Sequence, residues 1–190
     1  MNQTTVLVVH GFAVKSIVFS PLIYRLKHRS LDAVLFRYPS VGLPLQEIVD
    51  RLVSRLRDDR PAAVIAHSLG CMATMLAIRE TGWTGPVVLI APPFSTLPLT
   101  QWIPRFLRWP FAPLLDHRVL TSDSKYQLPK FDGCSVKSIV GRFDGAVPIR
   151  CSHNPNVDEQ RILLHTHNSL LFSSVVAELC CDWIVSNQVR

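Results

Sequence analysis

The stretch from Ala63 to Ile78, AVIAHSLGCMATMLAI, constrains the fold of this chain more than any other. Its beginning is a short apolar run typical of a buried strand, and its second half is rich in Leu, Ala and Met, which favour a helix. Ser68 lies at the abrupt junction, with the small residues Ala66 and Gly70 two positions to either side. A strand that turns directly into a helix with Ser at the turn is typical of a nucleophile elbow. We therefore expect Ser68 to be held out at the carboxyl edge of a sheet.

The rest of the chain alternates apolar runs with amphipathic segments. This alternation predicts a parallel sheet with helices on both faces, whose active site lies at the carboxyl ends of the strands. The expected class is therefore α/β, a three-layer, doubly wound and mostly parallel sheet of about six strands flanked by helices. The expected strands are 4–10, 32–38, 63–66, 86–91, 135–140 and 160–165, and the expected helices are 16–29, 44–59, 69–80 and 169–185.

The segment 92–134 interrupts this alternation. It holds seven of the fourteen prolines, which restrict the backbone and cannot donate a hydrogen bond to a sheet. Because 190 residues suit one domain, we expect a single domain over 1–190 with an insertion or lid at 92–134. A short helix over 101–109 is expected to place Trp102, Phe106 and Trp109 on one face. That face could line an apolar pocket, pack on the core or contact a membrane interface.

Composition excludes several other classes of protein. The chain has no apolar run long enough to span a membrane and no basic leader at its start, so no signal peptide is expected. Five cysteines without a C-x-x-C spacing argue against a disulfide framework or a zinc site and favour a cytoplasmic location. The net charge of +6 fits a basic solvated surface, and no nucleic-acid-binding motif accompanies it. No cofactor and no metal are expected.

Two motifs near the elbow carry a resemblance to a known family. The pentapeptide A-H-S-L-G at 66–70 resembles the G-H-S-L-G form common in the α/β-hydrolase family, and the His10-Gly11 pair after the first strand resembles its oxyanion loop. The resemblance implies that the N–H groups of Phe12 and Leu69 hold an oxyanion, and that His10 and Gly11 border the substrate. Because the chain begins at this strand, it resembles minimal lipases that lack the family's first strands.

A serine nucleophile needs a histidine base, which in turn needs an acid to orient it. The family order of Ser, acid and His, together with the G-R-F-D-G-A-V-P setting, implies that Asp144 is the acid. For the base, H-N-S-L-L resembles the family's H-x-x-L-L and favours His167, while His165 is expected to belong to the last strand. A metal site formed by these two histidines would lack a third ligand. The aspartates that follow no expected strand are Asp116, Asp123, Asp132 and Asp158.

The remaining histidines are not expected to take part in catalysis. His10 and His67 are expected to shape the oxyanion loop and the elbow. His28, His117 and His153 are expected at the surface.

Together these motifs predict a serine hydrolase of the compact lipase and esterase type. It would cleave a carboxylic ester through an acyl-enzyme formed by Ser68, Asp144 and His167. The alternatives are a thioesterase or acyltransferase that uses the same triad, and a non-catalytic binding protein with a hydrolase fold. The expected partner is a small-molecule acyl ester whose pocket is lined by Trp102 and Phe106, with a weak membrane-interface contact through 101–111.

Overall fold

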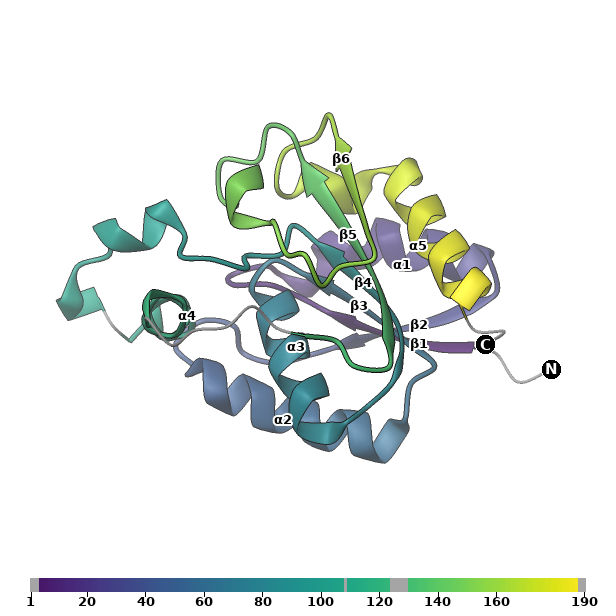
Figure 1. Cartoon of the computed structure of the whole chain (residues 1–190), viewed down its shortest axis with the longest axis horizontal. Helices are drawn as coiled ribbons and strands as arrows, with labels where there is room; N and C mark the ends of the chain where they lie inside the picture. Colours follow the sequence, from purple (N-terminus) through teal and green to yellow (C-terminus); the bar gives the residue numbers. More distant parts are fainter. Residues whose placement is uncertain (1–3, 108, 124–129, 188–190) are drawn as a thin grey trace.

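A computed structural model of the chain describes residues 4–107, 109–123 and 130–187, and within them six strands form one sheet (Figure 1). Each neighbouring pair of strands is parallel. The α/β class and the three-layer arrangement predicted from the sequence are therefore confirmed. In chain order the strands are β1 (Thr4–Val9), β2 (Leu31–Phe36), β3 (Ala63–His67), β4 (Gly85–Ile90), β5 (Cys134–Gly141) and β6 (Glu159–Leu163).

The order of the strands reverses beside β1. The sheet runs β2-β1-β3-β4-β5-β6, so the chain first moves outward to β2 and then returns to the other side of β1. Val9 at the end of β1 is in register with Ala66 near the end of β3. Ligands of open α/β sheets bind at such a switch point, outside the carboxyl ends of the strands. The loops after β1 and β3 therefore occupy the expected position of a binding site.

Helices cover both faces of the sheet (Figure 1). On one face lie α1 (Ser20–His28) and α5 (Ser174–Asn187), and on the other lie α2 (Leu45–Asp59) and α3 (Leu69–Thr81). Alternate residues of a strand point to opposite faces. In β1, accordingly, Val6 and Val8 join the core beneath α1 and α5, whereas Leu7 and Val9 join the core beneath α2 and α3. Among the described residues, no helix combines the length and the apolar character needed to cross a membrane.

Two predicted helices begin differently from expectation. Residues Ser16–Phe19 form a 3-10 turn, and α1 starts at Ser20 with Pro21 in its first turn, where its fixed backbone is favourable. The closing helix is likewise divided into a 3-10 turn, Ser169–Phe172, and α5. Val176, Ala177, Cys180, Cys181 and Ile184 form the buried face of α5.

The last strand is shorter than predicted. It ends at Leu163, because the His165 N–H donates to the Leu163 carbonyl at 2.8 Å and turns the chain away from the sheet. The expectation that His165 belongs to this strand is therefore wrong. Both His165 and His167 lie in the connection to the closing 3-10 turn.

The insertion after β4 also differs from the sequence prediction. A helix over 101–109 is wrong, since two 3-10 turns, Pro98–Trp102 and Arg105–Leu107, lie there on either side of Pro104. Proline removes a helical hydrogen-bond donor, which explains the interruption. The helix of this region is α4 (Ala112–Ser122), which lies beyond the sheet next to α2 (Figure 1). Residues 108 and 124–129 of the predicted insertion lie outside the described residues.

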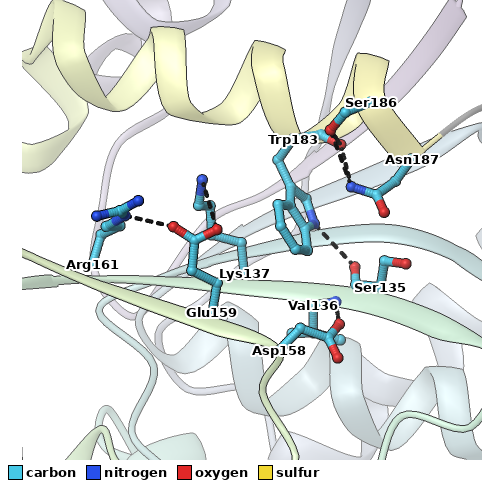
Figure 2. Close-up of polar contacts among 9 residues, drawn as sticks. All are labelled: Ser135, Val136, Lys137, Asp158, Glu159, Arg161, Trp183, Ser186 and Asn187. Carbon is cyan, nitrogen blue, oxygen red and sulfur yellow. Dashed lines mark hydrogen bonds and ion pairs between the residues drawn. The ribbon is translucent and has the colours of Figure 1, made fainter.

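Polar contacts fasten the edge strand β6 to the sheet and, through β5, to α5, as Figure 2 shows. The Lys137 ammonium of β5 lies 3.5 Å from the Glu159 carboxylate of β6 and 5.1 Å from the centre of the Trp183 ring. The Trp183 ring N–H donates to the Ser135 carbonyl at 3.1 Å. Since the Lys137 side chain is only 6% exposed, its ion pair is largely shielded from water. These contacts fix the strand that leads into the loop of His165 and His167.

Candidate active site

Ser68 lies in a strained turn between β3 and α3. Its backbone has φ 54° and ψ −128°, a conformation that non-glycine residues rarely adopt. The turn packs closely on the loop after β1, because a Cβ atom added at Gly70 would lie 2.4 Å from the His10 carbonyl oxygen. One added at Gly11 would lie 2.8 Å from the Cβ atom of Ser68. The two glycines thus allow the strained turn and the loop after β1 to be in contact.

The close approach at Gly70 predicts a loss of stability when a methyl group is added. Gly70→Ala should lower the free energy of unfolding by about 2 kcal/mol, because the methyl must displace backbone, a strain only partly offset by better helix propensity. Urea unfolding followed by circular dichroism measures this change. Gly145→Ala is the matched control, since nothing lies within 4 Å of a Cβ atom at Gly145. Equal midpoints for the two variants would contradict the predicted clash.

Asp144 and His167, the predicted acid and base, are in direct contact. They follow β5 and β6, and the Nδ1 of His167 lies 2.7 Å from the Asp144 Oδ2. The other carboxylate oxygen of Asp144 accepts the N–H groups of Ala146 at 2.9 Å and Val147 at 2.7 Å. The Asp144 side chain is fully buried, and that of His167 is 17% exposed. When Nδ1 donates to the carboxylate, Nε2 is left as the acceptor that a general base requires.

Ser68 and His167 line one pocket of about 290 Å³. Within the described chain no hydrogen bond joins the Ser68 hydroxyl to the His167 ring, and such bonds commonly tighten only when substrate binds. The remaining wall is mostly apolar. We call this cavity the apolar pocket, and its larger apolar residues are Phe12, Leu97, Leu99, Leu114 and Val147.

The two predicted oxyanion donors come from different segments: Leu69 directly follows Ser68 in the chain, and Phe12 lies in the loop after β1. Phe12 lines the apolar pocket. Leu69 is the first residue of α3, so its N–H has no partner within the helix. The loop that carries Phe12 is held in place because the Ala13 N–H donates to the Ser40 hydroxyl at 3.0 Å. The Tyr38 hydroxyl also donates to the carbonyl of His10, the residue that follows β1.

Two residues predicted to line the substrate pocket, Trp102 and Phe106, have other positions. Trp102 and Phe106 do not line the apolar pocket, since they are 77% and 85% exposed on the two 3-10 turns. The helix that should have brought them together is absent, and the pocket wall comes from Leu97, Leu99 and Thr100 instead. Gly11 lies against Ser68, and His10 lines a neighbouring pocket. Sequence reasoning missed these wall residues, and the apolar character of Leu97 and Leu99 was the one feature that could have indicated them.

His67 supports the loop of His167 and carries no charge. Burial, and to a smaller degree the proximity of His167, lowers the pKa of His67 to about 3. Its Nε2 lies 3.4 Å from the His167 carbonyl, and the two rings are 4.7 Å apart between centroids. His165 has a different partner, the Ser169 hydroxyl at 3.2 Å. Among the described residues, no cluster of three or more His, Cys, Asp or Glu side chains is arranged to hold a metal ion.

The prediction that His117 lies at the surface is wrong. It is fully buried on α4, and its Nε2 lies 2.8 Å from the Pro93 carbonyl. Asp116, the preceding residue, accepts the Leu45 N–H at the start of α2 at 2.9 Å. These two side chains fasten α4 to the segment after β4 and to α2. Neither role could be predicted, because α4 itself was not expected.

The model of the family described as "Alpha/beta hydrolase family" matches residues 6–167, which is most of the chain and includes all three predicted triad residues.

The chain belongs to the α/β-hydrolase family.

Solved structures share the fold of this α/β-hydrolase at low sequence identity. An esterase of Pyrococcus furiosus is 18% identical with a TM-score of 0.66, covering 98% of this chain and 82% of that one. The esterase domain of a Rhodothermus marinus protein is 16% identical with a TM-score of 0.62, covering 98% and 89%. A thioesterase of the prodiginine pathway in Streptomyces coelicolor is 13% identical with a TM-score of 0.62, covering 94% and 84%. A comparison with curated protein sequences gives no significant match.

Proposed function

We propose that this α/β-hydrolase is a serine hydrolase that cleaves carboxylic esters through an acyl-enzyme. The observation that carries this proposal is the 2.7 Å contact between His167 and Asp144 at a pocket that also contains the strained Ser68. A binding protein that merely kept the fold would have no use for these three side chains in this arrangement. The esterases among the solved structures of the same fold also favour this reading.

In the proposed mechanism, the Ser68 oxygen attacks the acyl carbon while His167 Nε2 takes the hydroxyl proton. Asp144 orients the ring and stabilises the imidazolium that forms. The N–H groups of Phe12 and Leu69 hold the oxyanion. The carbon–oxygen bond to the alcohol then breaks, and His167 gives its proton to the leaving oxygen. Water, deprotonated by His167, then attacks the acyl carbon. The bond from this carbon to the Ser68 oxygen breaks, and His167 returns the proton to that oxygen, which releases the acid and restores the serine hydroxyl.

The apolar pocket should select the acyl group. Each additional buried CH₂ group contributes about 0.8 kcal/mol, so kcat/KM should rise roughly ten-fold from acetyl to butyryl p-nitrophenyl esters. Leu99→Ala and Leu114→Ala should flatten this rise, because both side chains line the pocket. Trp102→Ala is the control and should keep the wild-type profile, since Trp102 points away from the pocket into solvent. A flattened profile in the Trp102 variant alone would contradict this assignment of the wall.

The same residues would also hydrolyse a thioester or transfer the acyl group to another alcohol or amine. A butyryl thioester and the matching oxygen ester, each assayed with and without an added alcohol, separate these reactions. The natural compartment proposed for this chemistry is the cytoplasm. Its support is that all five cysteines are free thiols.

We also propose that the exposed aromatic residues of 101–111 make a weak contact with a membrane interface. Trp102, Phe106 and Trp109 are each more than three-quarters exposed, and Leu99 connects this surface to the apolar pocket. Aromatic side chains and a net charge of +6 favour an anionic lipid surface.

The double variant Trp102→Ala, Phe106→Ala should weaken cosedimentation with vesicles of mixed neutral and anionic phospholipid about ten-fold. Ile17→Ala, at an exposed apolar residue elsewhere, should not. Equal sedimentation of all three proteins would contradict the contact.

A further inference from the structure

A second pocket, of about 510 Å³, opens beside the oxyanion loop, over the carboxyl ends of β1 and β2. Val14 lines both this pocket and the apolar pocket that contains Ser68. The two cavities therefore adjoin at Val14, in the loop after β1. We call the second cavity the basic pocket, and its polar lining consists of His10, Lys15, Ser16, Arg37, Tyr38 and Ser40.

The charged side chains that line the basic pocket are all positive. Among the described residues that line it, Lys15 and Arg37 are cationic and none is acidic. Neither cation forms an ion pair with another residue of the described chain. Two further titratable groups, His10 and Tyr38, stack with ring centroids 4.0 Å apart. Burial lowers the pKa of His10 and raises that of Tyr38, so both rings are neutral near pH 7.

The two adjoining pockets thus differ in chemistry in a way that suits the two sides of an ester. The apolar pocket accommodates the acyl chain, and the alcohol side then extends past residues 12–14 toward the cations. We propose that the basic pocket binds a phosphate group carried by the alcohol part of the substrate, through Lys15 and Arg37. Arginine offers a planar fork that matches phosphate oxygens, and lysine adds a mobile positive charge. The inference rests on the proposed ester hydrolysis, in which the phosphate itself does not react.

Three butyryl esters with the same two-carbon alcohol skeleton test the charge preference. These are butyryloxyethyl phosphate, ethyl butyrate and butyrylcholine, whose alcohol parts are anionic, neutral and cationic. At low salt, kcat/KM for the phosphate ester should exceed that for ethyl butyrate at least ten-fold, roughly the effect of charge-assisted hydrogen bonds at a partly exposed site. The preference should shrink as ionic strength rises, because salt screens exposed charges. Butyrylcholine should be the poorest substrate.

Variants of the two cations connect this preference to the basic pocket. In Lys15→Ala, Arg37→Ala the ratio of kcat/KM for the phosphate ester to that for ethyl butyrate should fall about ten-fold. Lys15→Glu, Arg37→Glu should reverse the order and favour butyrylcholine. Arg57→Ala, which removes an exposed cation from α2, should leave the ratio at its wild-type value. Thermal unfolding of each variant checks that it is folded.

The outcomes separate this inference from the proposed function. Hydrolysis of ethyl butyrate without any preference for the phosphate ester, or a preference that survives both double variants, would overturn the basic pocket alone. Failure of the wild-type protein to hydrolyse any of the three butyryl esters or the p-nitrophenyl esters would count against ester hydrolysis itself. A preference that Arg57→Ala also removes would assign the effect to overall charge and reject the pocket.

Discussion

Ser68→Ala should abolish turnover of p-nitrophenyl butyrate, with a loss in kcat of at least about 10⁴-fold. The methyl group of alanine cannot attack the acyl carbon. The nearby Cys71 thiol is buried, and burial raises its pKa well above the usual range, so it stays protonated. A fluorophosphonate probe should label the wild-type protein at Ser68 and leave the variant unlabelled. Intact-mass measurement and peptide mapping follow the label.

The control for this experiment is Ser54→Ala, which removes an exposed hydroxyl from α2. It should keep both labelling and turnover. Labelling of the wild-type protein at Cys71, or at no residue, would favour the non-catalytic binding protein over the serine hydrolase.

The second large effect is expected at the base. His167→Ala should lower kcat by about 10⁴-fold or more, because removal of the base leaves the serine hydroxyl unactivated. His165→Ala should retain most of the activity, since that ring contacts the Ser169 hydroxyl and not Asp144. The two variants lie in the same loop, so each serves as the matched control for the other. Steady-state kinetics with p-nitrophenyl butyrate compares them.

Inactivation of the His165 variant together with an active His167 variant would reject the triad that we propose. Loss of activity in both variants, accompanied by inactivation of the wild-type protein with a chelator, would instead revive a metal site at this pair.

Local sequence patterns were sufficient to predict the sheet and the elbow. Buried parallel strands are continuous apolar runs such as 86–91, and the small residues around Ser68 are required by the turn itself. The contact between Asp144 and His167 could be anticipated only through the resemblance to the hydrolase family. Spacing alone left His165 and His167 as rivals, because no local pattern marked Leu163 as the end of β6.

The insertion could not be predicted in the same way, because its structure depends on distant contacts. Pro104 made a continuous helix over 101–109 unfavourable, yet the aromatic residues suggested one apolar face. The burial of His117 depends on the Pro93 carbonyl, and the cap that Asp116 gives to α2 joins residues far apart in the chain. Neither hydrogen bond leaves a periodic pattern. For the same reason, the leucines that line the apolar pocket could not be distinguished from ordinary core residues.

The predicted nucleophile follows a central strand of the sheet, whereas the predicted base follows an edge strand. Ser68 follows β3, which pairs with a strand on each side. His167 follows β6, which is largely exposed and which, within the described part of the chain, pairs with β5 alone. Proteins open locally where fewer contacts protect the backbone, without unfolding as a whole. Brief detachment of β6 would carry the histidine away from the serine while the central strands stay folded. Amide hydrogen exchange would then be fastest in the part of the fold that assembles the site, and catalytic competence would fade at denaturant concentrations that leave the core intact.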